Sequence, residues 1–446
     1  MKPAGLTVEL RRLFSLALPL AAAEAGTQLM SVVDMAVIGR LGGVELAAVG
    51  VANAVFFGIS VFGLGLILGF DPLISQAVGA RDFTRARRVM WQGIWVGLIT
   101  SALLMIVLSS GPILFRAIGV KHEVVRPATT FLLIRLIGLP AWLVFFVIRA
   151  YLQAHHVTRP MVVSMIVSNV LNLIVDIVLV FGAGPIPALG VAGAAISTVS
   201  CQCLQTAIVA FAVDRMPAGG LVSRRWNGDD IRRALRVGVP TALQITAEVG
   251  IFALVALLAG RMGTIDLAAH QLVISLASFT FTMALGVATA GSVRVGLAVG
   301  ARDRHAARIA GYAAFVGAAI VMSVSATSFI AFPRALARMI TNKPEVVAAA
   351  LPLFLVAGLF QLSDGLQAAG IGALRGAADT RFAFFSNVVG YWIVGLPLSL
   401  YLGFHLHMGV VGLWWGFVAG LTTVAVLVFV RFRDLTAREI VPVHDR

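Results

Sequence analysis

Charged residues are scarce in this chain of 446 residues: only 12% are Asp, Glu, Lys or Arg, while 59% are hydrophobic. Soluble domains carry about 25% charged residues. A soluble chain of this length could not bury so much apolar surface, whereas the hydrocarbon core of a bilayer could accept it. The composition excludes an ordinary soluble protein and predicts an integral membrane protein in contact with the lipid bilayer.

Cysteine is almost absent, and so are the common catalytic motifs. Cys201 and Cys203 are the two cysteines, and at this spacing on a helix they face different directions, which argues against a disulfide or a metal site. The chain has no Walker A, HExxH or GxSxG motif, so neither direct ATP binding nor the matching hydrolytic chemistry is expected. We predict no enzyme and no resident cofactor. An intramembrane enzyme would need a nucleophile–base pair or a metal cluster in the spans, and none is evident.

Apolar runs of helix-spanning length follow one another along the whole chain with short connections. They predict an all-α membrane protein with about twelve transmembrane helices. The expected spans are 13–38, 46–70, 89–115, 128–153, 161–183, 189–213, 234–260, 267–291, 306–331, 348–374, 382–404 and 410–431.

The distribution of positive charge predicts the orientation. The net charge of +14 lies in short clusters between apolar runs, so we expect no nucleic-acid partner. With the N-terminus in the cytoplasm, 25 Lys and Arg residues fall inside and 8 outside, which is a strong positive-inside bias. Both termini are therefore expected in the cytoplasm. A cleaved signal peptide is not expected, because the first apolar run continues to Ile38.

The chain repeats itself with a displacement of 221 positions over about 75 residues without a gap. Pro19 aligns with Pro240, and the basic turn 79–82 aligns with 300–303. A period this long indicates two homologous halves, which is typical of transporters. We expect an N-lobe at 1–213, a cytoplasmic linker at 214–233 and a C-lobe at 234–446. Pro19 and Pro240 each interrupt the first helix of a half, where they are hinge candidates, the alternative being static kinks.

Acidic residues within apolar spans are the main functional candidates of the second half, because a charge at the bilayer centre costs at least about 2.5–3.5 kcal/mol. Glu248 lies near the middle of span 234–260, with Gln244 one turn earlier. Asp364 lies at a similar depth in an antiparallel span, flanked by Gln361 and Gln367. Two carboxylates at one depth can coordinate a cation or hold a proton. The alternative is a hydrogen-bond network that only fixes helix packing.

The first half carries a different set of polar residues. Asn169, Asn172 and Asp176 form one stripe on span 161–183. Asp34 lies toward the outer end of the first span, and Glu24 earlier in it. These are also candidates for ion coupling or for the substrate cavity, with packing again as the alternative.

Two further charged residues have other expected roles. Arg135 is a possible counter-ion for one of the intramembrane acids, without a sequence indication of which one. Asp71, followed by Pro72, is expected to cap a helix that restarts at the cytoplasmic side.

These residues resemble the motifs of the MATE family, the multidrug and toxic compound extrusion transporters, over essentially the whole chain. The most specific match is a run that begins Phe360-Gln361-Leu362-Ser363-Asp364 and continues to an "LRG, two residues, DT" string at 374–380. Other matches are Pro19 with Val33-Asp34 and Gly39, the run 76–80, Asn172 with Asp176, and Pro240 with Glu248.

The resemblance implies two pseudo-symmetric six-helix bundles around a cavity that opens alternately to each side. Cationic amphiphiles, including drugs and other xenobiotics, would leave as Na⁺ or H⁺ enters across a bacterial inner membrane, and the protein would act as a monomer. Glu248 and Asp364 look like the cation site of the NorM-type branch, and Asp34, Asn172 and Asp176 like the N-lobe site of the DinF-type branch. Phe360 departs from the tyrosine of some NorM-type members, which removes one potential oxygen ligand for Na⁺.

A flippase for lipid-linked oligosaccharides from the same superfamily is the main alternative. Such relatives tend to have more helices and cationic cavities for anionic headgroups. The cavity expected here is acidic, which disfavours this alternative.

Overall fold

The computed structural model describes residues 5–217, 220, 222–438 and 440–445. Lys2 and Arg446, two of the charges used to predict the orientation, lie outside these residues, as do positions 218, 219 and 221 of the expected linker. The described chain is helical apart from an isolated β-bridge between Ala183 and Ile186. Its helices are α1 (Leu6–Ile38), α2 (Gly43–Ile67), α3 (Phe70–Gly79), α4 (Phe83–Ser109), α5 (Gly111–Ala117), α6 (His122–Leu136), α7 (Leu139–Ala154), α8 (Arg159–Phe181), α9 (Val191–Asp214), α10 (Gly228–Met262), α11 (Thr264–Gly300), α12 (Arg304–Ala331), α13 (Pro333–Ile340), α14 (Pro344–Gly376), α15 (Thr380–Asn387), η1 (Val388–Gly395), α16 (Leu396–Leu400), η2 (Tyr401–His405), α17 (Gly409–Ala437) and η3 (Val443–Asp445).

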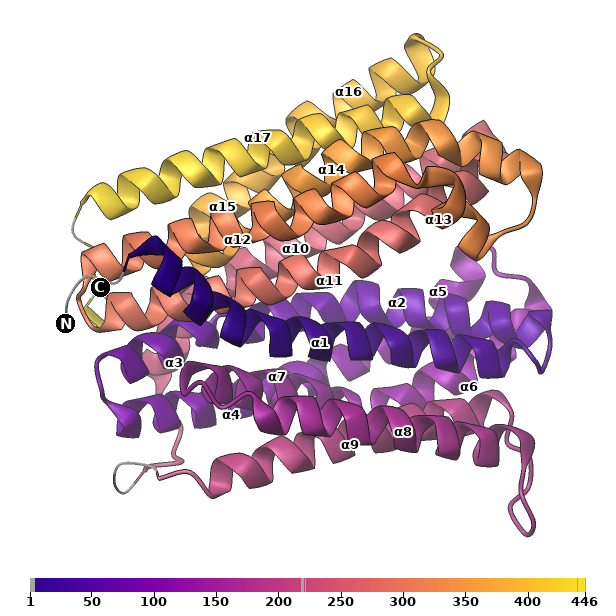
Figure 1. The fold of residues 1–446 in the computed structure, drawn as a ribbon. Helices are drawn as coiled ribbons and strands as arrows, with labels where there is room; N and C mark the ends of the chain where they lie inside the picture. Colours follow the sequence, from indigo (N-terminus) through magenta and orange to yellow (C-terminus); the bar gives the residue numbers. More distant parts are fainter. Residues whose placement is uncertain (1–4, 218–219, 221, 439, 446) are drawn as a thin grey trace. The chain divides into compact units, whose positions relative to one another are not determined.

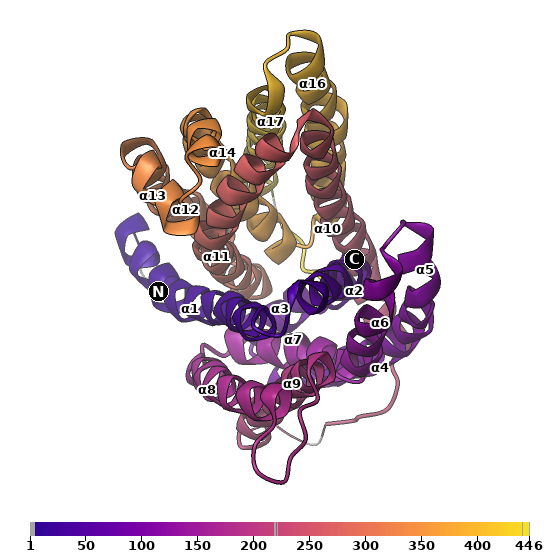
Figure 2. The same ribbon diagram turned by 90° about the vertical axis from the view of Figure 1, so that its right-hand side faces the viewer.

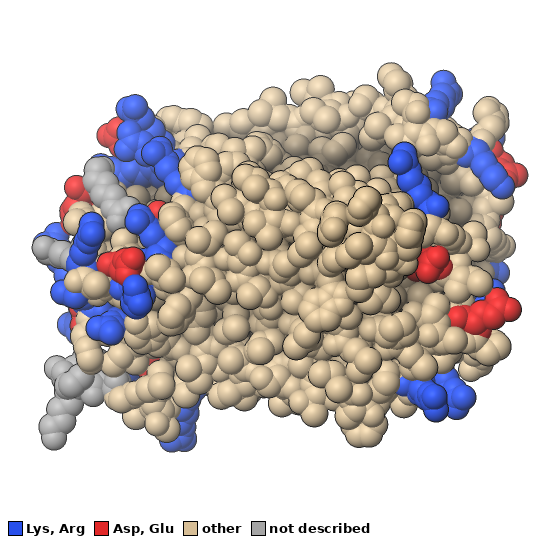
Figure 3. Space-filling model, turned by 90° about the horizontal axis from the view of Figure 1, so that it is seen from above, with Lys and Arg blue, Asp and Glu red and all other residues tan. Residues whose placement is uncertain are grey.

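The expected all-α membrane architecture is confirmed. In the described residues, eleven helical stretches are long and apolar enough to cross a bilayer, or twelve if α6 and α7, which meet at a bend of 45°, form one span. On the face seen in Figure 3, charged side chains gather at the two ends of the helices, more densely where α1 begins, and a band almost free of charge lies between them. Such a band is what a hydrocarbon core requires.

Besides the bent α6–α7 pair, two further spans differ from simple straight helices. The span expected at 46–70 continues from α2 into α3, and α3 begins at Phe70. Asp71 therefore lies in the first turn of α3 instead of capping it, a correction of the expected role. The eleventh span is interrupted by two π-helical stretches, η1 and η2, a geometry that is often found at functional sites.

The contacts divide the chain into two compact units, described here separately. Unit 1 contains Met1–Ala21, Gly79–Arg81 and Leu243–Arg446. In it, α14 packs against α11, α12 and α17, as the orange and yellow ribbons show (Figure 1 and Figure 2). Unit 2 contains Ala22–Val78 and Asp82–Ala242, with the helix pairs α8–α9, α4–α7 and α2–α6 in contact.

The first helix of each half begins in the unit formed mainly by the other half. We call residues 6–21 of α1 the first arm, which belongs to unit 1, and residues 228–242 of α10 the second arm, which belongs to unit 2. Each arm contains its proline, Pro19 or Pro240, and each ends within three residues of it. The chain therefore passes from one unit to the other next to a proline, twice.

Both arms pack on a glycine, and the two glycines are related by the 221-residue repeat. A Cβ placed on Gly286 would lie 2.7 Å from the Cβ of Ala21, and one placed on Gly65 would lie 2.9 Å from the Cβ of Ala242. Gly65 corresponds to Gly286 and Ala21 to Ala242. No side chain fits at either contact, because the neighbouring atoms include backbone. The two arms are held by the same contact, made twice.

Replacing Gly286 with valine should separate the first arm from α11. The added atoms would meet the carbonyl oxygen of Ala17, 2.8 Å from the Cβ position, and overpacking of this kind costs about 1–3 kcal/mol. We expect a clearly lower midpoint of thermal unfolding in detergent. Gly250→Ala is the control, since its nearest heavy atom lies 3.7 Å away. A Gly286→Val midpoint equal to that of the wild type would contradict the close contact.

Candidate functional site

Unit 1 brings Glu248 and Asp364 together through one glutamine. Glu248 lies on α10 and Asp364 on α14. The Gln367 amide nitrogen lies 3.2 Å from Glu248 Oε1 and 3.3 Å from Asp364 Oδ1, so one NH₂ group donates to both carboxyl groups. Gln367 is one turn after Asp364 on the same face of α14. The sequence analysis expected Glu248 and Asp364 at one depth, with Gln367 one turn from Asp364, and in the structure Gln367 contacts both acids.

Two further residues of this cluster were missed by the sequence analysis. Asn387 Nδ2 donates to Glu248 Oε2 at 3.2 Å, and the Tyr391 hydroxyl donates to Glu248 Oε1 at 3.3 Å. They lie at the end of α15 and in η1. Their spacing of four places both on one helix face. Two hydrogen-bonding side chains at this spacing in an apolar run were the sequence signal that could have identified them as part of a buried polar site.

The remaining polar residues of the Glu248–Asp364 cluster close its edges. Gln244, one turn before Glu248, lies within hydrogen-bonding reach of it, and the Gln361 amide donates to Thr280 Oγ1 at 2.6 Å. Phe360 packs edge-on against Phe252, Trp414 and Phe417. Phe252 also packs against Tyr391, whose phenolic hydroxyl is the only one that contacts Glu248 in the described chain.

The amide oxygens of this cluster lack hydrogen-bond donors. Among the described residues, the side-chain oxygens of Gln244, Gln361, Gln367 and Asn387 are buried without a partner. Buried acceptors normally have a donor, an ordered water or an ion. Together with two carboxyl groups they provide only oxygen ligands, which hard cations prefer. This set can accept a small cation, or a proton on either carboxyl group.

Unit 2 holds the second cluster, around Asp34 of α1 and Asp176 of α8. Thr198 of α9 donates to Asp34 Oδ2 at 3.2 Å, and Asn172 donates to Ser197 Oγ at 3.1 Å. The Asp34 and Asp176 side chains lie close enough to share a hydrogen bond when one carries a proton. Both Asp176 oxygens and one Asp34 oxygen are buried without a donor in the described chain. The Asp34–Asp176 cluster can therefore hold a shared proton or a cation.

The other candidates of unit 2 do not all join this cluster. Glu24 forms an ion pair with Arg149 at 2.6 Å, and the Asn169 amide donates to the Met165 carbonyl of its own helix at 2.9 Å. These contacts satisfy both residues locally. The charge of Arg135 interacts with that of Asp34, and its guanidinium lies 4.6 Å from the Phe56 ring centroid.

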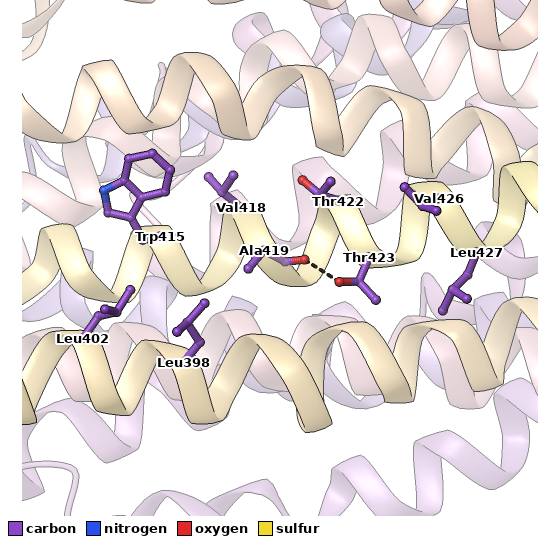
Figure 4. Close-up of a pocket in the computed structure, with 9 residues that line it drawn as sticks. All are labelled: Leu398, Leu402, Trp415, Val418, Ala419, Thr422, Thr423, Val426 and Leu427. Carbon is purple, nitrogen blue, oxygen red and sulfur yellow. Dashed lines mark hydrogen bonds between the residues drawn. The ribbon is translucent and has the colours of Figure 1, made fainter.

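An apolar groove of about 570 Å³ lies elsewhere in unit 1, between the eleventh span and α17. Figure 4 shows Trp415 and Val418 of α17 along it, with Leu398 and Leu402 opposite. Its two hydroxyl groups are already used, Thr422 with Ser363 and Thr423 with the carbonyl of Ala419. None of the candidate acids lines it, so this groove is unlike a site for a charged ligand.

The model of the MatE family matches residues 19–178 and 240–401, which covers most of the chain and both halves. The chain belongs to the MatE family. It is 36% identical over 434 residues to the "Probable multidrug resistance protein NorM" of Rhizobium meliloti, covering 95% of this chain and 93% of that protein. It is 32% identical over 440 residues to the "Multidrug resistance protein MdtK" of Yersinia pseudotuberculosis, with 96% of each covered.

Solved structures of the same fold confirm the architecture of this MatE protein. The crystal structure of the eukaryotic MATE transporter AtDTX14 superimposes with a TM-score of 0.88 at 22% identity, covering 97% of this chain and 98% of that one. An outward-facing multidrug resistance MATE family transporter of the MOP superfamily gives a TM-score of 0.89 at 20% identity, with 96% of each covered. The protein is a multi-pass membrane transporter and not an enzyme, as predicted.

Proposed function

We propose that this MatE protein exports cationic amphiphilic compounds, drugs among them, in exchange for Na⁺ or H⁺ by alternating access. The observation that carries this proposal is the Glu248–Asp364 cluster: two carboxyl groups bridged by Gln367 in the interior of apolar helices. Intramembrane acids at such positions mark ion pathways. The names of the two relatives, both multidrug resistance proteins, support the class of substrate.

Coupling follows from linkage between the ion and the conformation. An ion that binds to a carboxyl group more tightly in one conformation shifts the equilibrium toward that conformation. The size of the shift is set by the difference between its affinities for the two conformations. An entering Na⁺ or H⁺ would neutralise the acids that attract a cationic substrate, and so would favour its release. Moving one charge through about 100 mV supplies about 2.3 kcal/mol, enough for an accumulation of roughly 50-fold.

The two acidic clusters, one in each unit, differ in the side chains around their acids, and we propose that they bind different ions. The Asp34–Asp176 cluster has the close carboxyl pair that suits a shared proton. The Glu248–Asp364 cluster has the additional amide oxygens that suit a cation. Anionic lipid-linked headgroups are the poorer match, because both clusters contain two acids.

The arginines gathered where α1 begins support a cytoplasmic location for both termini, in the plasma membrane of a bacterium. We also propose that the transporter acts as a monomer.

Transport in proteoliposomes tests the coupling. Purified protein is reconstituted, Na⁺ and H⁺ gradients are imposed separately, and ethidium movement is followed by fluorescence with liposomes lacking protein as the control. We expect at least one gradient to drive ethidium against its concentration difference, and ionophores that dissipate that gradient to abolish the movement. Ethidium movement that responds to neither gradient would overturn the proposal.

A further inference from the structure

Each arm begins with a buried acid. Glu9 of the first arm is 5% exposed and Asp230 of the second arm is 3% exposed. The two positions differ by 221 residues, so the repeat relates them. Both lie in the first turn of their helix, where a negative charge interacts favourably with the helix dipole. That interaction does not require burial, so their buried positions need another reason.

Each acid binds an arginine from the other half of the sequence. Glu9 accepts two hydrogen bonds from Arg294 of α11, at 2.6 Å from Nε and 2.7 Å from Nη2. Asp230 accepts one from Arg88 Nε of α4 at 2.9 Å. The Glu9–Arg294 pair lies within unit 1 and the Asp230–Arg88 pair within unit 2. A bidentate or charge-assisted pair of this kind fixes geometry as well as adding energy.

The duplication alone does not explain the two pairs. The acids correspond, and so do Arg12 and Arg233, which lie 3.8 Å and 3.7 Å from them on the same helices. The arginine partners do not correspond: the repeat counterpart of Arg88 is Ile309, and that of Arg294 is Leu73. The same connection is thus made with arginines from two different places in the repeat. This indicates that the connection itself has a function.

We propose that the Glu9–Arg294 and Asp230–Arg88 pairs are two latches of the transport cycle, which hold the arms down in one conformation and open in the other. Each latch lies ten residues before the proline of its arm, and the arm ends just after that proline. Releasing a latch frees one end of its arm. The other end of the arm can bend at the proline, where the helix lacks one backbone hydrogen bond. A charged acid that stays buried without its arginine destabilises the protein. The acid of a latch therefore has two favourable states: buried and paired with its arginine, or unpaired and exposed to water. The inference rests on the proposed alternating access, and places the moving parts at the end of the helices proposed to face the cytoplasm.

Cysteine labelling measures the position of the arms directly. Leu16 and Val237 are repeat counterparts, are 2% and 4% exposed, and lie on the two arms between latch and proline. Leu16→Cys and Val237→Cys add no bulk. They are made separately in a background where Cys201 and Cys203 are replaced by alanine and which is first shown to transport ethidium. A membrane-impermeant maleimide is applied to inside-out and right-side-out vesicles.

Opening a latch should expose the cysteine of its own arm. We expect Glu9→Gln to raise the labelling rate at position 16 at least about fivefold, and Asp230→Asn to do so at position 237, both in inside-out vesicles. The charge exchange Glu9→Arg with Arg294→Glu should restore slow labelling, which a general loss of folding would not allow. Asp445→Asn is the matched control, because its pair with Arg302 is at the surface, and it should leave both rates unchanged.

The outcomes separate this inference from the proposed function. Labelling rates within twofold of the parent for both latch variants, in a background that still transports, would overturn the latches and leave the transport proposal intact. Fast labelling in both latch variants that the charge exchange does not reverse would also overturn them. A background protein that moves no ethidium under either gradient would instead contradict the proposed function.

Discussion

Replacing Asp364 with asparagine is expected to lower gradient-driven ethidium export at least about 50-fold, which corresponds to about 2.3 kcal/mol. The variant keeps the size of the side chain and can still form a hydrogen bond with Gln367, so the packing of α14 should be unaffected. It loses the exchangeable charge in the Glu248–Asp364 cluster. Without that charge, a Na⁺ or H⁺ gradient can no longer bias the two conformations through this site. Initial rates in proteoliposomes under each gradient measure the effect.

The matched control for this prediction makes the same chemical change at the surface. Asp434 on α17 pairs only with its neighbour Arg433, and its side chain is more than half exposed. Asp434→Asn should export at the wild-type rate. Equal amounts of both variants in the membrane and equal unfolding midpoints exclude a folding defect. Wild-type export by Asp364→Asn under both gradients would remove the Glu248–Asp364 cluster from the coupling mechanism.

Much of the fold follows from the sequence because bilayer-spanning helices have one dominant signal. An apolar run of sufficient length must form a helix, since hydrocarbon offers no partner for the backbone. All twelve expected spans coincide with helices in the structure, and most boundaries differ by a few residues. The depth of Glu248 and Asp364 could also be estimated by counting residues from the helix ends, since each residue adds a fixed rise of about 1.5 Å.

Contacts between helices could not be predicted in the same way. Asn387 and Tyr391 are unremarkable in an apolar span until the eleventh span is placed against α10, where both reach Glu248. The pairing of Glu24 with Arg149 had no sequence signal, because the two lie 125 positions apart on helices whose order in space is set by packing. The repeat identified the two prolines but did not indicate that each arm packs with the other half of the chain.

The two clusters differ in how their acids are neutralised, although the repeat relates α1, which carries Asp34, to α10, which carries Glu248. Glu248 is surrounded by side-chain donors from Gln367, Asn387 and Tyr391. Both Asp176 oxygens are buried without a hydrogen bond of good geometry in the described chain, and Asp176 interacts with another acid, Asp34. Two acids in contact cannot both be ionised cheaply in a low-dielectric interior, so one proton stabilises the pair. We therefore propose the second cluster, in which two acids face each other, as the site of a shared proton.

Asp176→Asn is therefore expected to weaken the pH dependence of substrate binding. In the wild type, protons should compete with a cationic substrate at the Asp34–Asp176 cluster, so that ethidium binds more tightly as pH rises. Asparagine imitates the protonated acid at all pH values. The variant should bind ethidium at least about tenfold more weakly than the wild type at the alkaline end, which corresponds to about 1.4 kcal/mol. It should also show less than half of the wild-type pH dependence.

Fluorescence titration of ethidium in detergent at a series of pH values measures both quantities without requiring transport. Asp214→Asn is the control, because Asp214 is exposed at the end of α9 and the same chemical change there leaves the cluster intact. A wild-type pH profile in Asp176→Asn would exclude this pair as the site of proton competition. Loss of pH dependence in Asp176→Asn but not in Asp364→Asn would assign the proton to unit 2. It would leave the oxygen-rich cluster of unit 1, with its four unpartnered amide oxygens, as the site where a metal cation would act.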